Sequence, residues 1–148
     1  MNDTPWNTAL NLLARREHSQ QELREKLRKR YPEEDARVED ALARLVERGL
    51  QDDERFAEAF VRSRHQRGHG PVRIRFDARQ KGVEAQVNAV LDESQFDWYE
   101  LAAEVATRKL GTADITELKV KAKLYRFLSQ RGFQPDHIRL AVETLKDE

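Results

Sequence analysis

Residues 124–132 read LYRFLSQRG, residues 74–82 read IRFDARQKG, and residues 23–31 read LREKLRKRY. In each stretch an apolar residue at the first position is followed, four positions later, by a second one. The resulting pairs are Leu23/Leu27, Ile74/Ala78 and Leu124/Leu128, and they are separated by 51 and 50 residues. Apolar residues four positions apart lie on one face of an α-helix. A helical unit that recurs at a fixed period of this length indicates a helical-repeat protein.

Helical periodicity extends through the rest of the chain, and capping signals divide it. Thr4 before Pro5 is typical of a helix start, and Ser19 with Glu22 three residues later forms a capping box. The glycines that follow amphipathic runs suit the left-handed position after a helix, and they are Gly49, Gly82, Gly111 and Gly132. We predict helices over residues 5–16, 20–31, 33–48, 53–67, 71–81, 84–93, 98–110, 114–131 and 136–146.

These segments group into three sets of three helices. The sequence therefore predicts an all-α protein built of three tandem three-helix repeats, at residues 1–51, 52–95 and 96–148. Each repeat buries a modest core by itself, and stacking along the chain adds to that core. We expect the repeats to form an elongated, curved array.

Composition limits what the chain can be. Of 148 residues, 36% are charged and 39% are hydrophobic, which suits layered helices that each bury one stripe. The absence of cysteine excludes disulfides and thiolate metal sites. No apolar run approaches the roughly 18 residues of a membrane span, and the first residues lack the features of a secretion signal. We therefore expect a cytoplasmic protein that does not contact a membrane.

Charge alternates strongly along the chain although its net value is zero. Residues 15–30, 62–81 and 108–131 each hold seven Lys and Arg, with net charges of +4, +6 and +5. Residues 31–58 and 82–104 each have a net charge of −6. A cluster of one sign that recurs once per repeat predicts a surface for an anionic partner. Isolated charge runs are more often solvated helix faces with local ion pairs, but three runs in register favour the functional interpretation.

The basic stretches supply the candidate binding residues. Arg75 and Arg79 lie one helical turn apart, where their mutual repulsion does not favour stability. Gly68 and Gly70 make a compact turn at which the backbone can approach a partner closely. The candidate residues for binding an anionic partner are Arg24, Lys26, Arg28, Arg62, Arg64, Arg67, Arg73, Arg75, Arg79, Lys81, Lys119, Lys123 and Arg126.

Other kinds of site are poorly supported. His65 and His69 have a spacing that can present two imidazoles to a metal, but Gly68 interrupts the helix and there is no evident third ligand. A histidine on the surface or facing DNA is the better interpretation. The sequence contains no phosphate-binding loop, nucleophile elbow or dinucleotide fingerprint. We therefore expect no catalytic activity, no metal and no cofactor.

Four strings of this sequence are similar to those of a known family. They are LLARREHSQQELREKLRKR, DDERFAEAFVRSR, GHGPVRIRFDARQKGV and KAKLYRFLSQRGF. Taken in order they cover almost the whole chain, and they resemble the RecX family of regulators of the RecA recombinase. The resemblance implies tandem three-helix repeats and a monomer that acts in DNA repair, recombination and the SOS response.

The resemblance also implies partners and an activity. Such a protein binds RecA filaments on single-stranded DNA in their helical groove, with weaker binding to double-stranded DNA. It restrains filament growth, ATP hydrolysis and strand exchange. The candidate binding residues would then contact RecA or DNA, and the basic positions that match the family are Arg64, Arg73, Arg75, Arg79 and Lys81. The sequence departs from its relatives at Phe76-Asp77-Ala78, where we expect Phe76 to compensate for the small core contact of Ala78.

Two other functions remain open. A three-helix unit can contain a helix-turn-helix, so a DNA-binding transcription regulator that forms a dimer on a duplex site is the alternative. A helical-repeat adaptor without a nucleic-acid role is the third candidate.

Overall fold

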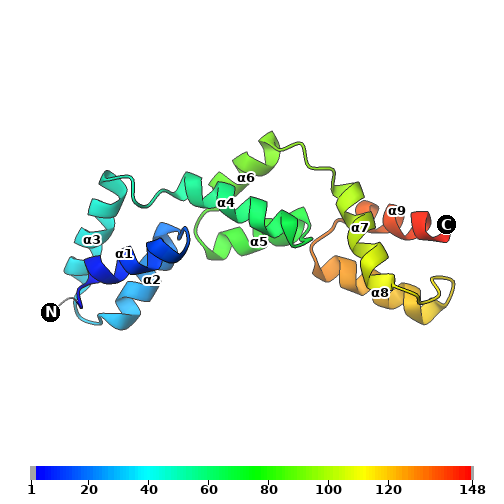
Figure 1. The fold of residues 1–148 in the computed structure, drawn as a ribbon, viewed down its shortest axis with the longest axis horizontal. Helices are drawn as coiled ribbons and strands as arrows, with labels where there is room; N and C mark the ends of the chain where they lie inside the picture. The colour runs from blue at the N-terminus through cyan, green and yellow to red at the C-terminus, as the bar shows by residue number, and fades with distance from the viewer. Residues whose placement is uncertain (1–2, 148) are drawn as a thin grey trace. The chain divides into compact units, whose positions relative to one another are not determined.

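The computed structural model describes residues 3–147 and contains nine α-helices in that range, with no strand (Figure 1). The all-α prediction is therefore confirmed for the described chain. The helices are α1 (Pro5–Arg15), α2 (Gln20–Arg30), α3 (Asp35–Glu47), α4 (Asp53–Gln66), α5 (Pro71–Gln80), α6 (Glu84–Glu93), α7 (Trp98–Leu110), α8 (Leu118–Gln130) and α9 (Pro135–Lys146).

Side-chain caps make the predicted starts of α1 and α2. The Thr4 hydroxyl accepts a hydrogen bond of 3.1 Å from the backbone N–H of Asn7. At α2 the capping box is complete, because Ser19 and Glu22 each accept the other's backbone N–H at 3.1 Å. These bonds satisfy N–H groups that have no partner within the helix. Local sequence alone therefore sets where α1 and α2 begin.

The predicted start of α8 was wrong by four residues. Residues before Leu118 form turns, in which the Asp114 carboxylate accepts hydrogen bonds from the Thr116 N–H at 2.9 Å and hydroxyl at 2.6 Å. A side chain that satisfies the backbone locally competes with helix formation. Ile115, in the same turn, is only 8% exposed and packs into the core. The segment is thus held by its own hydrogen bonds and by burial rather than by a helical turn.

The described chain divides into two compact units, and the boundaries between them fall within α4, α5 and α6. One unit contains residues 3–60 and 78–90, and the other contains residues 61–77 and 91–147. In the first, α1, α2 and α3 pack against one another around a buried cluster (Figure 1). The buried members are Ala9, Leu23, Leu27, Tyr31, Val38, Leu42 and Leu45.

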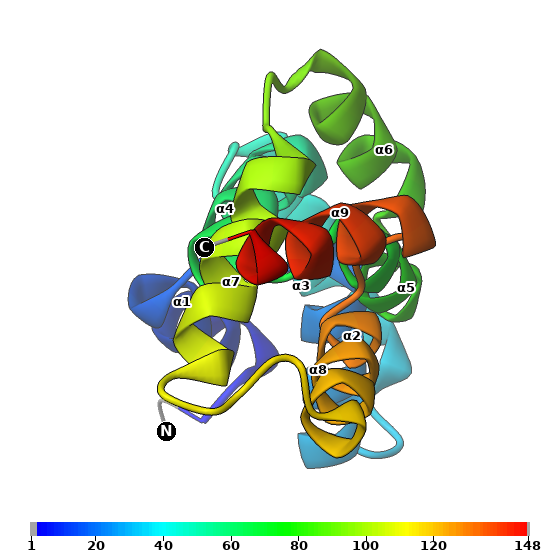
Figure 2. The same ribbon diagram turned by 90° about the vertical axis from the view of Figure 1, so that its right-hand side faces the viewer.

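The second unit contains the bundle of α7, α8 and α9. In Figure 2 α9 lies across α7, against which it packs most extensively, and α8 packs against both. The members of its core that come from α8 are Leu124 and Leu128, and Phe133 follows that helix. The remaining buried members are Leu101, Ala102, Val105, Ala106, Ile115, Ile138, Ala141 and Val142.

The six residues that define the sequence repeat are all buried. Leu23, Leu27, Ile74, Ala78 and Leu128 have no exposed surface, and Leu124 is 3% exposed. The interpretation of these pairs as core positions is confirmed. Phe76, however, is 54% exposed, so the expectation that it compensates for Ala78 in the core was wrong. Its position between the buried neighbours Ile74 and Ala78 turns its side chain away from the face that those two residues bury.

The glycines predicted after helices all have positive φ, and Gly132 has a further role. A Cβ on Gly132 would lie 2.4 Å from the Arg73 backbone nitrogen, and one on Gly70 would lie 2.4 Å from the Gly132 carbonyl oxygen. This approach lets Gly70 donate to the Arg131 carbonyl at 2.7 Å, and Val72 to that of Gly132 at 3.0 Å. The close backbone approach that the sequence indicated at Gly70 is thus made within the same unit.

Candidate functional site

Two basic residues of α2, Arg24 and Arg28, pair with acidic residues of α3. Arg24 donates from Nε and Nη2 to the two carboxylate oxygens of Glu39, at 2.8 and 3.0 Å. Arg28 reaches the same carboxylate at 3.3 Å. The hydrogen bond between Arg24 and Glu39 lowers the pKa of Glu39 and raises the pKa of Arg24. The acidic stretch that follows α2 therefore neutralises part of the basic surface in its own repeat.

Lys81 is held by a buried carboxylate. Glu22 is 5% exposed and accepts hydrogen bonds from Arg16 at 2.8 Å and from Lys81 at 3.0 Å, both within the first unit. Burial would raise the pKa of Glu22, but these bonds and the one from the Ser19 N–H lower it to about 2. Releasing Lys81 to a partner would leave a buried charge with less compensation, which is costly. Lys81 is therefore poorly suited to bind phosphate in this conformation.

Replacing Glu22 with glutamine should alter the pH dependence of stability. The pKa of Glu22 falls from 4.5 to about 2 on folding, so its stabilisation is present above pH 4.5 and is lost as the pH falls towards 2. We expect the Glu22→Gln variant to melt at a lower temperature than wild type at neutral pH, and this difference to shrink across that interval. Thermal unfolding followed by circular dichroism measures it. The exposed Glu25→Gln on the same helix is the control, and a constant difference for Glu22→Gln at every pH would contradict the assignment.

Lys26 is partnered by a histidine. His18 is 2% exposed, and its Nδ1 lies 3.0 Å from the Arg16 carbonyl oxygen while its Nε2 lies 3.0 Å from Lys26 Nζ. The ring therefore donates from Nδ1 and accepts from the lysine. Burial is the main cause that lowers the pKa of both His18 and Lys26.

The central basic stretch is only partly paired. Asp77 contacts both Arg64 and Arg73, the latter at 3.7 Å, and Arg79 lies 3.3 Å from Glu84. The remaining candidates of this stretch differ in exposure. Arg75 is half-buried, whereas Arg62 and Arg67 are exposed and form no ion pair within residues 3–147.

Of the candidate binding residues, those of α8 are the most accessible to an anionic partner. Lys119, Lys123 and Arg126 are exposed, and none is in an ion pair with another described residue. Their spacing of four and three residues places them on one side of the helix, which we call the α8 basic face. The first turn of α8 contains Lys119 and no acidic residue. A cation at that end opposes the helix dipole, so stability does not explain this arrangement.

The histidines are structural rather than surface groups. The ring of His65 stacks on that of Phe96 with their centroids 3.8 Å apart, and Trp98 meets it edge-on at 5.6 Å. His69 is 7% exposed, which contradicts the interpretation of a surface or DNA-facing residue. Burial is the largest cause, ahead of the nearby arginines, that lowers its pKa to about 4. No group of three His, Asp or Glu within residues 3–147 could hold a metal ion.

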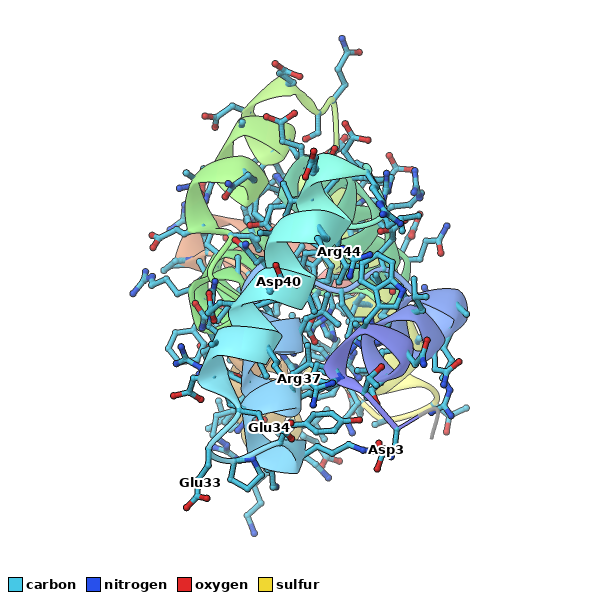
Figure 3. The ribbon with its side chains drawn as sticks, turned by 90° about the vertical axis from the view of Figure 1, so that its left-hand side faces the viewer. Asp3, Glu33, Glu34, Arg37, Asp40 and Arg44 are labelled. Carbon is cyan, nitrogen blue, oxygen red and sulfur yellow. The ribbon has the colours of Figure 1, made fainter. Side chains whose placement is uncertain are left out.

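Trp6 had no role that the sequence could assign. In the structure it packs against the core of the first unit, and the guanidinium of Arg44 lies 4.4 Å from its ring centroid. Arg44 is on the side of α3 that faces α1 (Figure 3). Arg37, earlier on the same helix in Figure 3, instead pairs with Glu34 at 2.6 Å. Arg44 is thus a further basic residue that makes a contact within the protein, here a cation–π interaction with Trp6.

Across the described part of the chain, no helix has the length and apolar character that a bilayer crossing requires.

Comparison with known proteins gives matches along almost the whole chain. Three family models match in order, described as the first, second and third three-helix domains of RecX, over residues 6–45, 52–87 and 96–142. Regulatory protein RecX of Halorhodospira halophila is 40% identical over 143 residues, covering 96% of this chain and 88% of that protein. Its counterpart in Stenotrophomonas maltophilia strain K279a is 40% identical over 146 residues, covering 98% and 89%.

Solved structures show the same fold. The crystal structure of RecX from Lactobacillus salivarius superposes with a TM-score of 0.76 at 22% identity, covering 97% of this chain and 96% of that one. A second crystal structure of regulatory protein RecX gives a TM-score of 0.74 at 28% identity, covering 97% and 72%. Three three-helix domains in tandem are therefore shared with proteins of known structure.

Proposed function

This chain belongs to the RecX family, and from that premise we propose that it is a negative modulator of the RecA recombinase. It binds RecA filaments on single-stranded DNA in their helical groove. Bound there, it limits filament growth, ATP hydrolysis and strand exchange during DNA repair and recombination. We further propose that the protein is a monomer, that it acts in the cytoplasm and that it has no catalytic activity of its own.

The observation that carries the proposal is the ordered match of all three RecX domains along one chain. We take the repeats as residues 1–51, 52–95 and 96–148, each of which contributes its own weak contacts to the filament. Contacts on one chain act together, because the first to form raises the effective concentration of the others. A protein with modest individual contacts can therefore hold several neighbouring sites of a polymeric partner.

The electrostatics divide the candidate residues into two groups. The α8 basic face, Arg62 and Arg67 can meet an anionic partner without first losing an ion pair to a described residue. Arg28 and Arg79 are 50% and 62% exposed, and their ion pairs contribute only about 0–1 kcal/mol at such exposure. A filament phosphate or carboxylate can replace those partners at little cost. We therefore propose that the first group makes the initial contacts and that the exposed paired arginines join after binding.

The direct test adds the purified chain to RecA filaments assembled on single-stranded DNA and measures ATP hydrolysis. We expect hydrolysis to fall with increasing protein, and the half-inhibiting concentration to rise with salt because counterions compete for the basic face. Hydrolysis that stays constant at every protein concentration, with filaments present, would refute the proposal. A transcription regulator would instead leave hydrolysis unchanged and bind duplex DNA at a preferred sequence.

A further inference from the structure

Basic residues line a pocket in the second unit, and only one of them, Arg67, is among the candidate binding residues predicted from the sequence. The pocket has a volume of about 250 Å³ and lies among the turn after α4, the last turn of α7, and α8. Its basic lining residues are Arg67, Arg108, Lys109 and Arg131, and none of its described lining residues is acidic. We call it the Phe127 pocket after the aromatic residue among them.

Two of these cations lie against the aromatic ring. Lys109 Nζ is 4.7 Å and Arg131 Cζ is 4.9 Å from the centroid of Phe127. Arg131 also donates from Nη1 to the Arg67 carbonyl oxygen at 3.1 Å, which orients its guanidinium. Neither Lys109 nor Arg131 forms an ion pair within residues 3–147. The pocket thus contains oriented positive charge without an internal counterion.

The backbone of Gly68 makes this arrangement possible. Gly68 has φ of +79°, and a Cβ there would lie 2.8 Å from Val105 Cγ2. Without a side chain, the turn after α4 can lie against α7 and bring Arg67 to the same pocket as the last turn of α7. The sequence suggested that the backbone at Gly68 could approach a partner closely. In the structure its close neighbour is instead Val105 of the same unit, and this contact forms one wall of the pocket.

We propose that the Phe127 pocket binds a phosphodiester group of single-stranded DNA together with the adjacent base. The four cations complement the phosphate, and the planar guanidinium can donate two hydrogen bonds to it. The guanidinium plane of Arg131, which lies over the Phe127 ring, can also stack on an unpaired base of any sequence. An acidic peptide would satisfy the cations with carboxylates but would offer no planar ring for stacking. The choice of DNA rather than RNA rests on the proposed function.

The test measures binding of the full chain, without recombinase, to a fluorescein-labelled oligothymidylate by fluorescence anisotropy. Arg108→Ala with Lys109→Ala should weaken binding about tenfold at low salt. It should also reduce the slope of log affinity against log salt by about 0.7 for each phosphate that the protein no longer neutralises. Arg139→Ala with Lys146→Ala removes the same charge from exposed positions of α9 and should change affinity less than about twofold.

A second variant examines the ring. Phe127→Leu retains an apolar side chain against the core but removes the ring on which Lys109 and Arg131 lie. Because these cations then lose the contact that positions them, binding should weaken about fivefold or more. Its melting curve confirms that the bundle remains folded. If the pocket variants bind the oligonucleotide as tightly as the α9 control, the proposal is wrong. It is equally wrong if they lose affinity only for a labelled oligoglutamate peptide, because the ligand is then a carboxylate.

The outcome is separable from that of the recombinase assay. A wild-type chain that binds the oligonucleotide through the pocket but never affects RecA would support the site and overturn the proposed function. A wild-type chain that inhibits RecA but does not bind the oligonucleotide at low salt would overturn the site and leave the proposed function in place.

Discussion

Replacing Leu124 with alanine should lower the free energy of unfolding of the α7–α9 bundle by about 2–5 kcal/mol. Leu124 is 3% exposed and lies in a core cluster to which α7, α8 and α9 all contribute. Removing its side chain reduces apolar burial and leaves a space that close-packed neighbours fill only in part. We expect circular dichroism to show a lower melting temperature, with the helical signal of this bundle lost first.

Leu118→Ala is the matched control for that experiment. Leu118 belongs to the same helix but is 81% exposed, so the same change of side chain removes little buried surface. Its effect on the free energy of unfolding should stay within about 0.5 kcal/mol. Equal melting curves for the two variants would contradict the assignment of Leu124 to the core.

Reversing the charge of the α8 basic face should have the largest effect on function. We expect Lys119→Glu, Lys123→Glu and Arg126→Glu together to raise the half-inhibiting concentration in the RecA ATP hydrolysis assay at least about tenfold. Each change turns attraction to a polyanionic filament into repulsion, and the salt dependence of any remaining inhibition should become weaker. A glutamate at position 119 also suits the start of a helix.

A variant with the same change in net charge controls for non-specific electrostatics. Arg37→Glu, Arg48→Glu and Arg139→Glu reverse three exposed residues outside the proposed surface. If this control loses as much inhibition as the α8 variant, net charge rather than a defined face governs binding, and the proposed surface is incorrect. Melting curves of both variants establish that each remains folded at the assay temperature.

Most helices were predictable because their signals are local. Apolar residues at helical spacing marked the faces that became buried, and Thr4 and Ser19 cap the helices that they were expected to start. The start of α8 was not predictable from periodicity. There, the hydrogen bonds of Asp114 and the burial of Ile115 outweighed a continuous pattern.

For the candidate site, the sequence predicted only that basic residues would form it. The basic stretches were visible in the sequence, but pairing between helices decided which of their residues stay available. Arg24 meets Glu39 from another helix, and Lys81 meets Glu22 across 59 residues of chain. Nothing in the local sequence around Phe127 indicated that two cations lie on its ring.

Short-range patterns thus encode this protein's helices, its threefold repeat and its alternation of charge, because helix propensity, capping and apolar spacing act within a few residues. Tertiary packing decides which basic residues remain available to a partner. Whether Arg28 or Lys123 has a carboxylate beside it depends on which helix faces lie together, and the Phe127 pocket depends on the turn at Gly68 lying against α7. Such contacts join residues far apart in the chain, so the available charge becomes defined only when the helices pack.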